Sequence, residues 1–257
     1  MLSSSNARLA SARRLTGRKE RRETGRFLAE GAQAVREALA AGAVEELFAT
    51  AEAAARYPEL AAGASEISER DAAALSETVT PQGLIAVCRL DQPTANEVLA
   101  RGPRLLVVTV ECNEPGNLGT IIRTADAAGA DAVIWDDGVD PYNGKAVRAS
   151  AGSLFHLPVL PCAAEDLLSG CYYAGVTALA TTGGGSATLD ELIDDGTLAR
   201  PTVWLFGNEA HGLPNSVLEC ADRTVAVPIY GRAESLNLAA AAAVCLYASA
   251  RAQRATR

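Results

Sequence analysis

The feature that most constrains the fold is a series of short apolar runs between residues 105 and 228. They do not alternate strictly between apolar and polar residues, as expected for strands that are covered on both faces. The segments between them show helical spacing. The runs are LLVVTV (105–110), AVIW (132–135), GVTALAT (175–181), TVWLF (202–206) and TVAVP (224–228), with helices expected over 118–128, 144–150, 164–169, 189–194 and 236–254. This pattern predicts an α/β domain with a parallel sheet.

A weaker alternation of the same kind precedes this domain. Strands are expected over 26–30, 44–49, 66–68 and 83–90, and helices over 6–22, 31–41, 51–57 and 71–76. The stretch around DQPT and RGPR lacks a strong apolar pattern and is interpreted as a linker. We therefore divide the chain into a basic leader (1–24), a small α/β domain (25–92), a linker (93–103) and the larger domain (104–257).

The charges are distributed unevenly along a chain whose net charge is -8. Residues 1–26 hold eight basic side chains against Glu20 and Glu23, and Arg251, Arg254 and Arg257 lie at the other end. Basic ends commonly contact polyanions, although a solvated helix without a specific partner explains them about as well. A transit peptide is disfavoured, because the basic run continues into the first structural unit without a small-residue cleavage pattern.

Membrane and metal functions are not indicated. The longest apolar stretch without a charge, residues 236–250, is mostly alanine and shorter than the roughly 20 residues that span a bilayer. The six cysteines form no CxxC pair and only two histidines could join them, so neither a zinc site nor a disulfide framework is signalled. We expect a soluble cytoplasmic protein without a metal.

Three segments of the larger domain carry polar residues that an ordinary α/β core does not need. They are NEPGNLGTIIR (113–123), LFGNEAHGLP (205–214) and VPIYGRAESLNLAAAAA (227–243). The first suggests an anion site at a helix N-terminus, but simple turn chemistry with Asn117 as N-cap also explains it. Glu209 follows a buried strand, where open α/β sheets bind ligands, yet it could belong to a surface loop. Ser235 and Asn237 open an alanine-rich helix, and Ser235 is itself a good N-cap.

In this order, the three segments resemble the motifs of the SpoU/TrmH family of SAM-dependent RNA ribose 2'-O-methyltransferases, which belong to the knotted SPOUT superfamily. RASAGSLFHLPV (148–159) resembles the segment between the first two motifs. GRFLAEGAQAVREAL (25–39) and LSETVTPQGLIAVC (75–88) resemble the family's small L30e-like substrate-binding domain. The resemblance therefore covers nearly the whole chain.

The resemblance implies a SPOUT domain with a deep trefoil knot, an L30e-like domain before it, and a homodimer formed through the SPOUT domain and its long C-terminal helix. It implies that S-adenosyl-L-methionine (SAM) is held largely by backbone groups. The residues that match cofactor positions are Thr181, Gly207, Val227, Ile229 and Leu236. Those that match catalytic positions are Asn117, Arg123, Glu209, Ser235 and Asn237.

The two-domain layout resembles the family branch that methylates 23S ribosomal RNA, with tRNA as the second choice of substrate. The basic residues expected to contact RNA are Arg8, Arg13, Arg14, Arg18, Lys19, Arg21, Arg22 and Arg26. Because a guanidinium stays protonated in proteins, we expect Arg123 to bind a phosphate and stabilise the developing alkoxide rather than act as a base. The alternatives are a catalytically silent RNA-binding or ribosome-assembly protein of the same fold, and an unrelated nucleotide-binding α/β enzyme.

Overall fold

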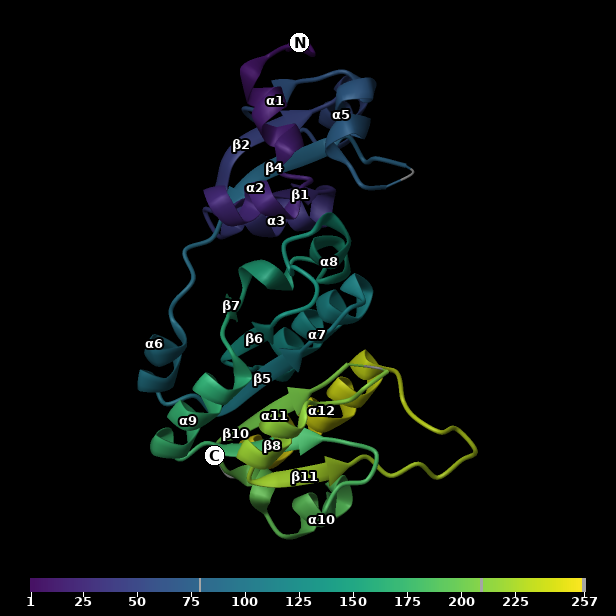
Figure 1. Cartoon of the computed structure of the whole chain (residues 1–257). Helices are drawn as coiled ribbons and strands as arrows, with labels where there is room; N and C mark the ends of the chain where they lie inside the picture. The colour runs from purple at the N-terminus through teal and green to yellow at the C-terminus, as the bar shows by residue number, and fades with distance from the viewer. Residues whose placement is uncertain (79, 209, 256–257) are drawn as a thin grey trace. The chain divides into compact units, whose positions relative to one another are not determined.

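The structure is a computed structural model that describes residues 1–78, 80–208 and 210–255. The chain divides into two compact units, and each takes two stretches of the sequence (Figure 1). The first unit comprises Met1–Asp91 and Asp140–His156, and the second comprises Gln92–Val139 and Leu157–Arg257. Residues 140–156 therefore belong to the first unit, although the sequence analysis assigned them to the larger domain.

The first unit is built on a four-stranded sheet in the order β1-β4-β2-β3. Strands β1 and β2 pair antiparallel with β4, whereas β3 runs parallel to β2. The elements of its first stretch are α1 (Ala7–Arg14), α2 (Arg18–Thr24), β1 (Arg26–Glu30), α3 (Ala32–Ala40), β2 (Val44–Ala49), α4 (Ala51–Arg56), β3 (Ser65–Glu66), α5 (Glu69–Leu75) and β4 (Leu84–Arg89). Its second stretch forms α8 (Gly144–Ala149) and the short helix η1 (Ser153–Phe155).

Aromatic packing holds the second stretch in this unit. The ring of Phe27 in β1 lies 4.9 Å from the ring of Tyr142 and 5.9 Å from that of Phe155, measured between centroids. Arg148 of α8 adds an ion pair of 3.5 Å with Glu30 at the end of β1. Contacts between residues so far apart in sequence leave no local signal, which explains why the domain boundary was misplaced.

The predicted basic leader is an integral part of the first unit. Leu9, Ala12 and Leu15 are fully or almost fully buried, and Leu9 and Leu15 pack with Phe48 and Ile85 of the sheet. The single helix expected over 6–22 is broken into α1 and α2. The boundary predicted after residue 24 is therefore wrong, because one face of this segment contributes to the core.

Arg21 stabilises the break between the two helices. Its Nη1 donates hydrogen bonds of 2.8 Å to the carbonyl oxygens of Leu15 and Thr16, which follow the end of α1. Carbonyl groups at a helix C-terminus lack intrahelical partners, so a guanidinium is a suitable donor there. Its Nε also pairs with Asp140 at 2.7 Å, and both side chains are less than a tenth exposed. Burial thus removes Arg21 from the residues expected to contact RNA.

The second unit is a seven-stranded sheet in the order β7-β6-β5-β10-β8-β11-β9, and all its strand pairs are parallel, as predicted. Strand β10 lies between β5 and β8, although it follows both in the chain. The elements are α6 (Ala95–Ala100), β5 (Leu105–Val110), α7 (Pro115–Ala128), β6 (Ala132–Asp136), β7 (Val159–Pro161), α9 (Ala164–Ala174), β8 (Thr177–Thr181), β9 (Ala187–Thr188), α10 (Leu189–Asp194), η2 (Thr197–Ala199), β10 (Thr202–Phe206), α11 (Asn215–Cys220), β11 (Arg223–Ala226) and α12 (Leu238–Ala255).

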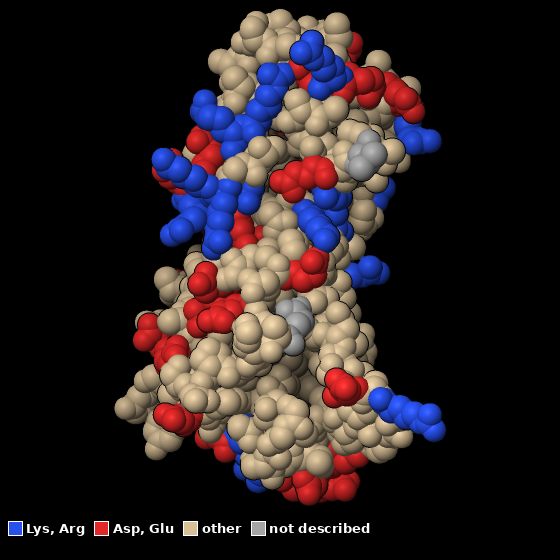
Figure 2. Space-filling model, turned by 45° about the vertical axis from the view of Figure 1, so that its right-hand side comes forward, with Lys and Arg blue, Asp and Glu red and all other residues tan. Residues whose placement is uncertain are grey.

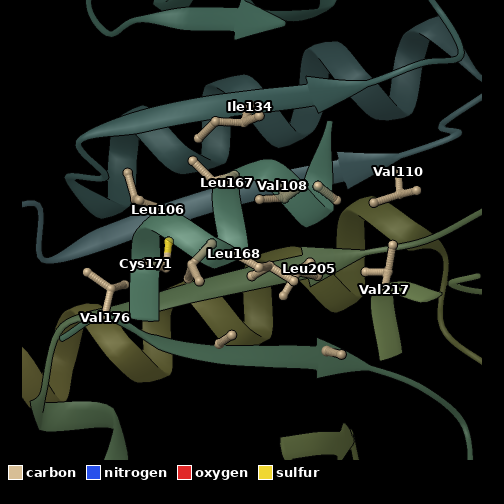
Figure 3. Packing of buried hydrophobic residues seen from close by; sticks show 14 of the residues in the cluster. Leu106, Val108, Val110, Ile134, Leu167, Leu168, Cys171, Val176, Leu205 and Val217 are labelled. Atoms are coloured by element: carbon tan, nitrogen blue, oxygen red, sulfur yellow. The ribbon is translucent and has the colours of Figure 1, made fainter. Parts of the chain in front are cut away.

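Both faces of this sheet are covered by helices. On one face, Leu106 and Leu205 pack with Leu167 and Leu168 of α9, as Figure 3 shows. On the other face, Trp204 donates a hydrogen bond of 2.8 Å to the Ser249 hydroxyl of α12. Burial on both sides accounts for the absence of strict alternation in the apolar runs. Within the described ranges, no helix has the length and hydropathy needed to cross a membrane.

The segment interpreted as a linker, residues 93–103, instead contains α6. Thr94 and Glu97 form a capping box at its start, in which each side chain accepts a hydrogen bond from the other residue's backbone N–H. Val98 is buried in the same cluster as α9. The linker prediction is therefore wrong, since these residues are a packed helix of the second unit.

The Arg21–Asp140 pair yields a stability test. Replacing Arg21 with alanine leaves the buried Asp140 carboxylate without its cation, so we expect Arg21→Ala to lower the free energy of unfolding by about 3 to 5 kcal/mol. The neighbouring Arg22 is exposed, and Arg22→Ala should change the free energy by less than about 0.5 kcal/mol. Urea unfolding followed by circular dichroism measures both, and equal stabilities would contradict the structural role of Arg21.

Candidate functional site

A pocket of about 380 Å³ opens where β8, β10 and β11 end at their carboxyl ends. Open α/β sheets bind ligands at this edge, and the size is that of a small-molecule site. Three connections form its walls: the residues that follow β8, the loop that follows β10, and the segment that joins β11 to α12. The second and third of these connections contain two of the three polar segments singled out from the sequence.

All five residues that the resemblance matched to cofactor positions line this pocket, namely Thr181, Gly207, Val227, Ile229 and Leu236. The sequence analysis missed other lining residues, which include Thr182, Gly183, Asn208, Gly212 and Glu234. One signal for them was available, because the glycine run over 183–185 directly follows a predicted strand. A glycine run in that place marks a backbone that approaches a ligand or another segment closely.

The loop after β10 brings two backbone segments into direct contact. The backbone N–H of Asn208 donates to the Gly212 carbonyl at 3.0 Å, and the N–H of Gly212 donates to the Asn208 carbonyl at 2.8 Å. A Cβ atom on Gly207 would overlap the carbonyl group of Gly212, so no other residue fits there without displacing the loop. Gly212 itself has a φ of +71°, which favours glycine.

Asn208 fixes this loop to the neighbouring strand. Its Oδ1 accepts a hydrogen bond of 2.7 Å from the backbone N–H of Ala210, and its Nδ2 donates one of 3.0 Å to the carbonyl of Glu111, which follows β5. The side chain is buried, so these bonds are protected from water. Glu209, matched to a catalytic position, lies outside the described residues.

The segment before α12 is anchored by Asn237. Its Oδ1 accepts hydrogen bonds from the backbone N–H groups of Ala239 at 2.9 Å and Ala240 at 3.3 Å, so Asn237 is the N-cap of α12. The sequence analysis considered Ser235 for this role, and that interpretation is wrong. The helix begins at Leu238, two residues later than expected, which leaves Ser235 exposed on the pocket wall.

The start of α7 differs from the prediction in the same way. Glu114 is the N-cap, its side chain accepts from the Gly116 N–H at 3.2 Å, and Pro115 occupies the first helical position. Asn117 is therefore not a cap but lies in the first turn, where its Oδ1 accepts a hydrogen bond of 3.1 Å from Nδ2 of Asn237. The first and third polar segments meet at this bond.

Arg123 lies further along α7 and is exposed. It makes no hydrogen bond or ion pair within the described chain, and it is not among the residues that line the pocket. The structure thus places Ser235 and Asn237 on the pocket wall and bonds Asn117 to Asn237, while Arg123 presents an exposed guanidinium further along α7.

The cysteines contribute to the core. Burial raises the pKa of the Cys88, Cys171 and Cys245 thiols to about 12 each. They stay protonated at neutral pH and are poor metal ligands or nucleophiles. In the part of the chain that the structure describes, no group of three or more His, Cys, Asp or Glu side chains is arranged to hold a metal ion.

The corrected capping assignment can be tested by two matched variants. Asn237→Ala removes the side chain that caps α12, and should lower the free energy of unfolding by about 1 kcal/mol. Ser235→Ala removes an exposed hydroxyl that caps no helix, and should change it by less than about 0.5 kcal/mol. Thermal or urea unfolding of the full chain compares the two, and a larger loss for Ser235→Ala would contradict the assignment.

Comparison with known proteins finds a family match in each half of the chain. Residues 104–247 match the SpoU rRNA Methylase family and residues 6–86 match the MRM3-like substrate binding domain. The chain is 39% identical over 254 residues to the 23S rRNA (guanosine(2553)-2'-O)-methyltransferase RlmP of Bacillus subtilis, an alignment that covers 95% of this chain and 96% of that protein.

Solved structures resemble the chain over almost its whole length. The SpoU methyltransferase AviRb of Streptomyces viridochromogenes, in complex with the cofactor AdoMet, superposes with a TM-score of 0.83 at 32% identity and covers 98% of this chain and 99% of its own. The AdoMet-bound rRNA methyltransferase of Sinorhizobium meliloti superposes with a TM-score of 0.81 at 30% identity and covers 98% and 97%. With its motif order, its parallel sheet and its pocket at the strand ends, this chain belongs to the SpoU rRNA methylase family.

Proposed function

We propose that this protein transfers a methyl group from SAM to the 2'-hydroxyl of a ribose in 23S ribosomal RNA. The observation that carries the proposal is the 39% identity with a 23S rRNA 2'-O-methyltransferase across both units, not the catalytic unit alone. A match that includes the substrate-binding domain supports a shared type of RNA substrate as well as shared chemistry.

The pocket suits SAM in size and chemistry. Its volume lies in the range of small-molecule sites, and it combines apolar side chains with backbone groups and a few hydroxyl or amide groups. Gly183 and Gly207 line the pocket without side chains, while Ile229 and Leu236 offer apolar surface. We infer that these residues, with Thr181 and Val227, hold the cofactor. When bound, SAM supplies an activated methyl group on a positively charged sulfonium.

The chain's own residues would align the ribose and stabilise the charge that develops on its oxygen. Arg123 is exposed and lacks a partner in the described chain, so its guanidinium is available to grip the phosphate beside the target ribose. A guanidinium does not give up its proton, so Arg123 stabilises the alkoxide instead of acting as a base. Asn117 and Asn237, bonded to each other, hold the pocket's edge, and Ser235 and Glu209 complete the proposed site.

RNA contacts are proposed for the outer side of α1 and α2. Arg8, Arg14, Arg18, Lys19 and Arg22 are exposed there, and Figure 2 shows Lys and Arg side chains gathered on the side that carries these helices. Arg13 and Arg26 are half-buried and pair with Asp71 and Glu45, so they contribute less. Exposed basic side chains bind RNA phosphates and release counterions.

The proposal also includes a homodimer, a trefoil knot and a cytoplasmic location. Support for the dimer comes from α12, which exposes the apolar side chains of Val244 and Tyr247 on one face, at the spacing of one helical turn. Support for the knot comes from membership of the family and from β10, which lies between β5 and β8 although it follows both in the chain. Support for the location comes from the proposed ribosomal substrate.

Methylation mapping tests the function. Ribose methylation of ribosomal RNA and tRNA is compared in cells with and without the gene, and in deleted cells that carry a plasmid copy. We expect one 23S ribose to lose its methyl group on deletion and to regain it with the plasmid. Loss of a tRNA methyl group instead would move the substrate to tRNA, and no change in either RNA would contradict the activity.

Variants at Arg123 test its role in the same system. Arg123→Ala and Arg123→Lys should both lower turnover by at least about 100-fold, because lysine cannot form the bidentate contact of a guanidinium. SAM affinity should stay within about twofold, since Arg123 does not line the pocket. Methyl transfer from labelled SAM and calorimetry give the two quantities. Near-native turnover of Arg123→Lys would contradict a bidentate phosphate contact.

The basic helices are tested by salt dependence. Combined Arg14→Ala, Arg18→Ala and Arg22→Ala exchanges should weaken RNA binding and reduce the slope of log affinity against log salt by roughly two to three units. Arg36→Ala, Arg56→Ala and Arg70→Ala provide a control, because they remove the same charge from exposed positions on other helices of the first unit. Equal slopes for the two triple variants would contradict the assignment.

A further inference from the structure

One wall of the pocket is strongly exposed. Every residue over 229–237 is exposed, and Figure 1 shows the segment between β11 and α12 running out beyond the sheet. Ile229 and Leu236 from this segment nevertheless line the pocket. The C-terminal end of the wall is anchored at Asn237, which caps α12 and bonds to Asn117.

The other end of the wall is held by Tyr230. Its hydroxyl donates a hydrogen bond of 2.7 Å to the carboxylate of Asp190, in the first turn of α10. Within the described chain, this is the only hydrogen bond between residues 228–236 and the rest of the unit. The bond to Asp190 raises the pKa of Tyr230, which keeps the phenol protonated as a donor. The tyrosine side chain is otherwise in solvent, with 86% of its surface exposed.

The bond connects the segment after β11 to α10, which follows the connection from β8. Asp190 follows the segment that begins with Thr182 and Gly183, both of which line the pocket. Earlier along the same two segments, the backbone N–H of Ser186 donates to the Thr224 hydroxyl at 2.9 Å. The pairing of β9 with β11 follows directly. Among the described residues that follow this pairing, the hydrogen bond between Tyr230 and Asp190 is the last connection between the two segments.

We propose that the Tyr230–Asp190 hydrogen bond is a latch that holds the 229–237 wall closed and sets how long SAM stays in the pocket. The inference rests on the proposed function, because SAM is the ligand retained. Tyr230 is a positioning residue, since it does not itself line the pocket. A single exposed hydrogen bond is weak, so the wall exchanges between closed and open forms, and SAM affinity scales with the closed fraction.

Removal of the hydroxyl tests the latch directly. In Tyr230→Phe we expect the Kd of SAM to rise about 3- to 10-fold, mainly through faster dissociation, with little change in turnover at saturating SAM. Asp190→Ala should have the same effect, and the double variant should lose no more than either single variant. Calorimetry gives Kd, and stopped-flow displacement of SAM gives the dissociation rate.

Two variants serve as controls. Tyr173→Phe removes a hydroxyl from another exposed tyrosine of the same unit, on α9, and should leave SAM binding unchanged. Asp190→Asn keeps an oxygen acceptor and should retain most of the affinity.

Unchanged dissociation in both Tyr230→Phe and Asp190→Ala would overturn the latch, as would additive losses in the double variant. Failure of the unaltered protein to bind SAM would instead overturn the proposed function.

Discussion

The close approach of two backbone segments after β10 is the constraint on which the pocket depends. Gly207 lies against Gly212 without room for a side chain, and Asn208 ties the loop to the end of β5. Because β10 is a central strand buried on both faces, the base of this loop cannot shift without disturbing the core. This buried base contrasts with the segment over 229–237, in which every residue is exposed.

Burial divides the arginines of the first unit into two groups with different consequences. Arg21 lies in the core, where the carbonyl groups of Leu15 and Thr16 and the Asp140 carboxylate use its hydrogen-bonding capacity. Arg18 and Arg22, one helical turn apart on α2, are exposed. A net charge counts both kinds alike, which is why Arg21 was included among the basic residues expected to contact RNA.

Much of the fold could be predicted from the sequence, because it depends on local patterns. The five strands expected in the second unit lie within a few residues of their predicted positions, whereas β7, β9 and α11 were not predicted. The sequence also contains the residue pattern of the Thr94–Glu97 capping box. Because the apolar pattern around it is weak, the segment was nevertheless interpreted as a linker. At the site, Ser235 is as favoured an N-cap residue as Asn237, and Asn117 is more favoured than Glu114. Which candidate caps a helix depends on where the backbone turns, and propensity does not decide that.

By itself, the sequence determined the parallel α/β class, the order of the three polar segments and the family that they resemble. Each of these conclusions depends on short stretches of neighbouring residues. Tertiary structure alone decided that residues 140–156 join the first unit, that Asn117 meets Asn237, and that Tyr230 reaches Asp190. These pairings join side chains separated by dozens of residues. Their formation depends on how whole elements pack, and a pattern read along one segment holds no information about the distance to another.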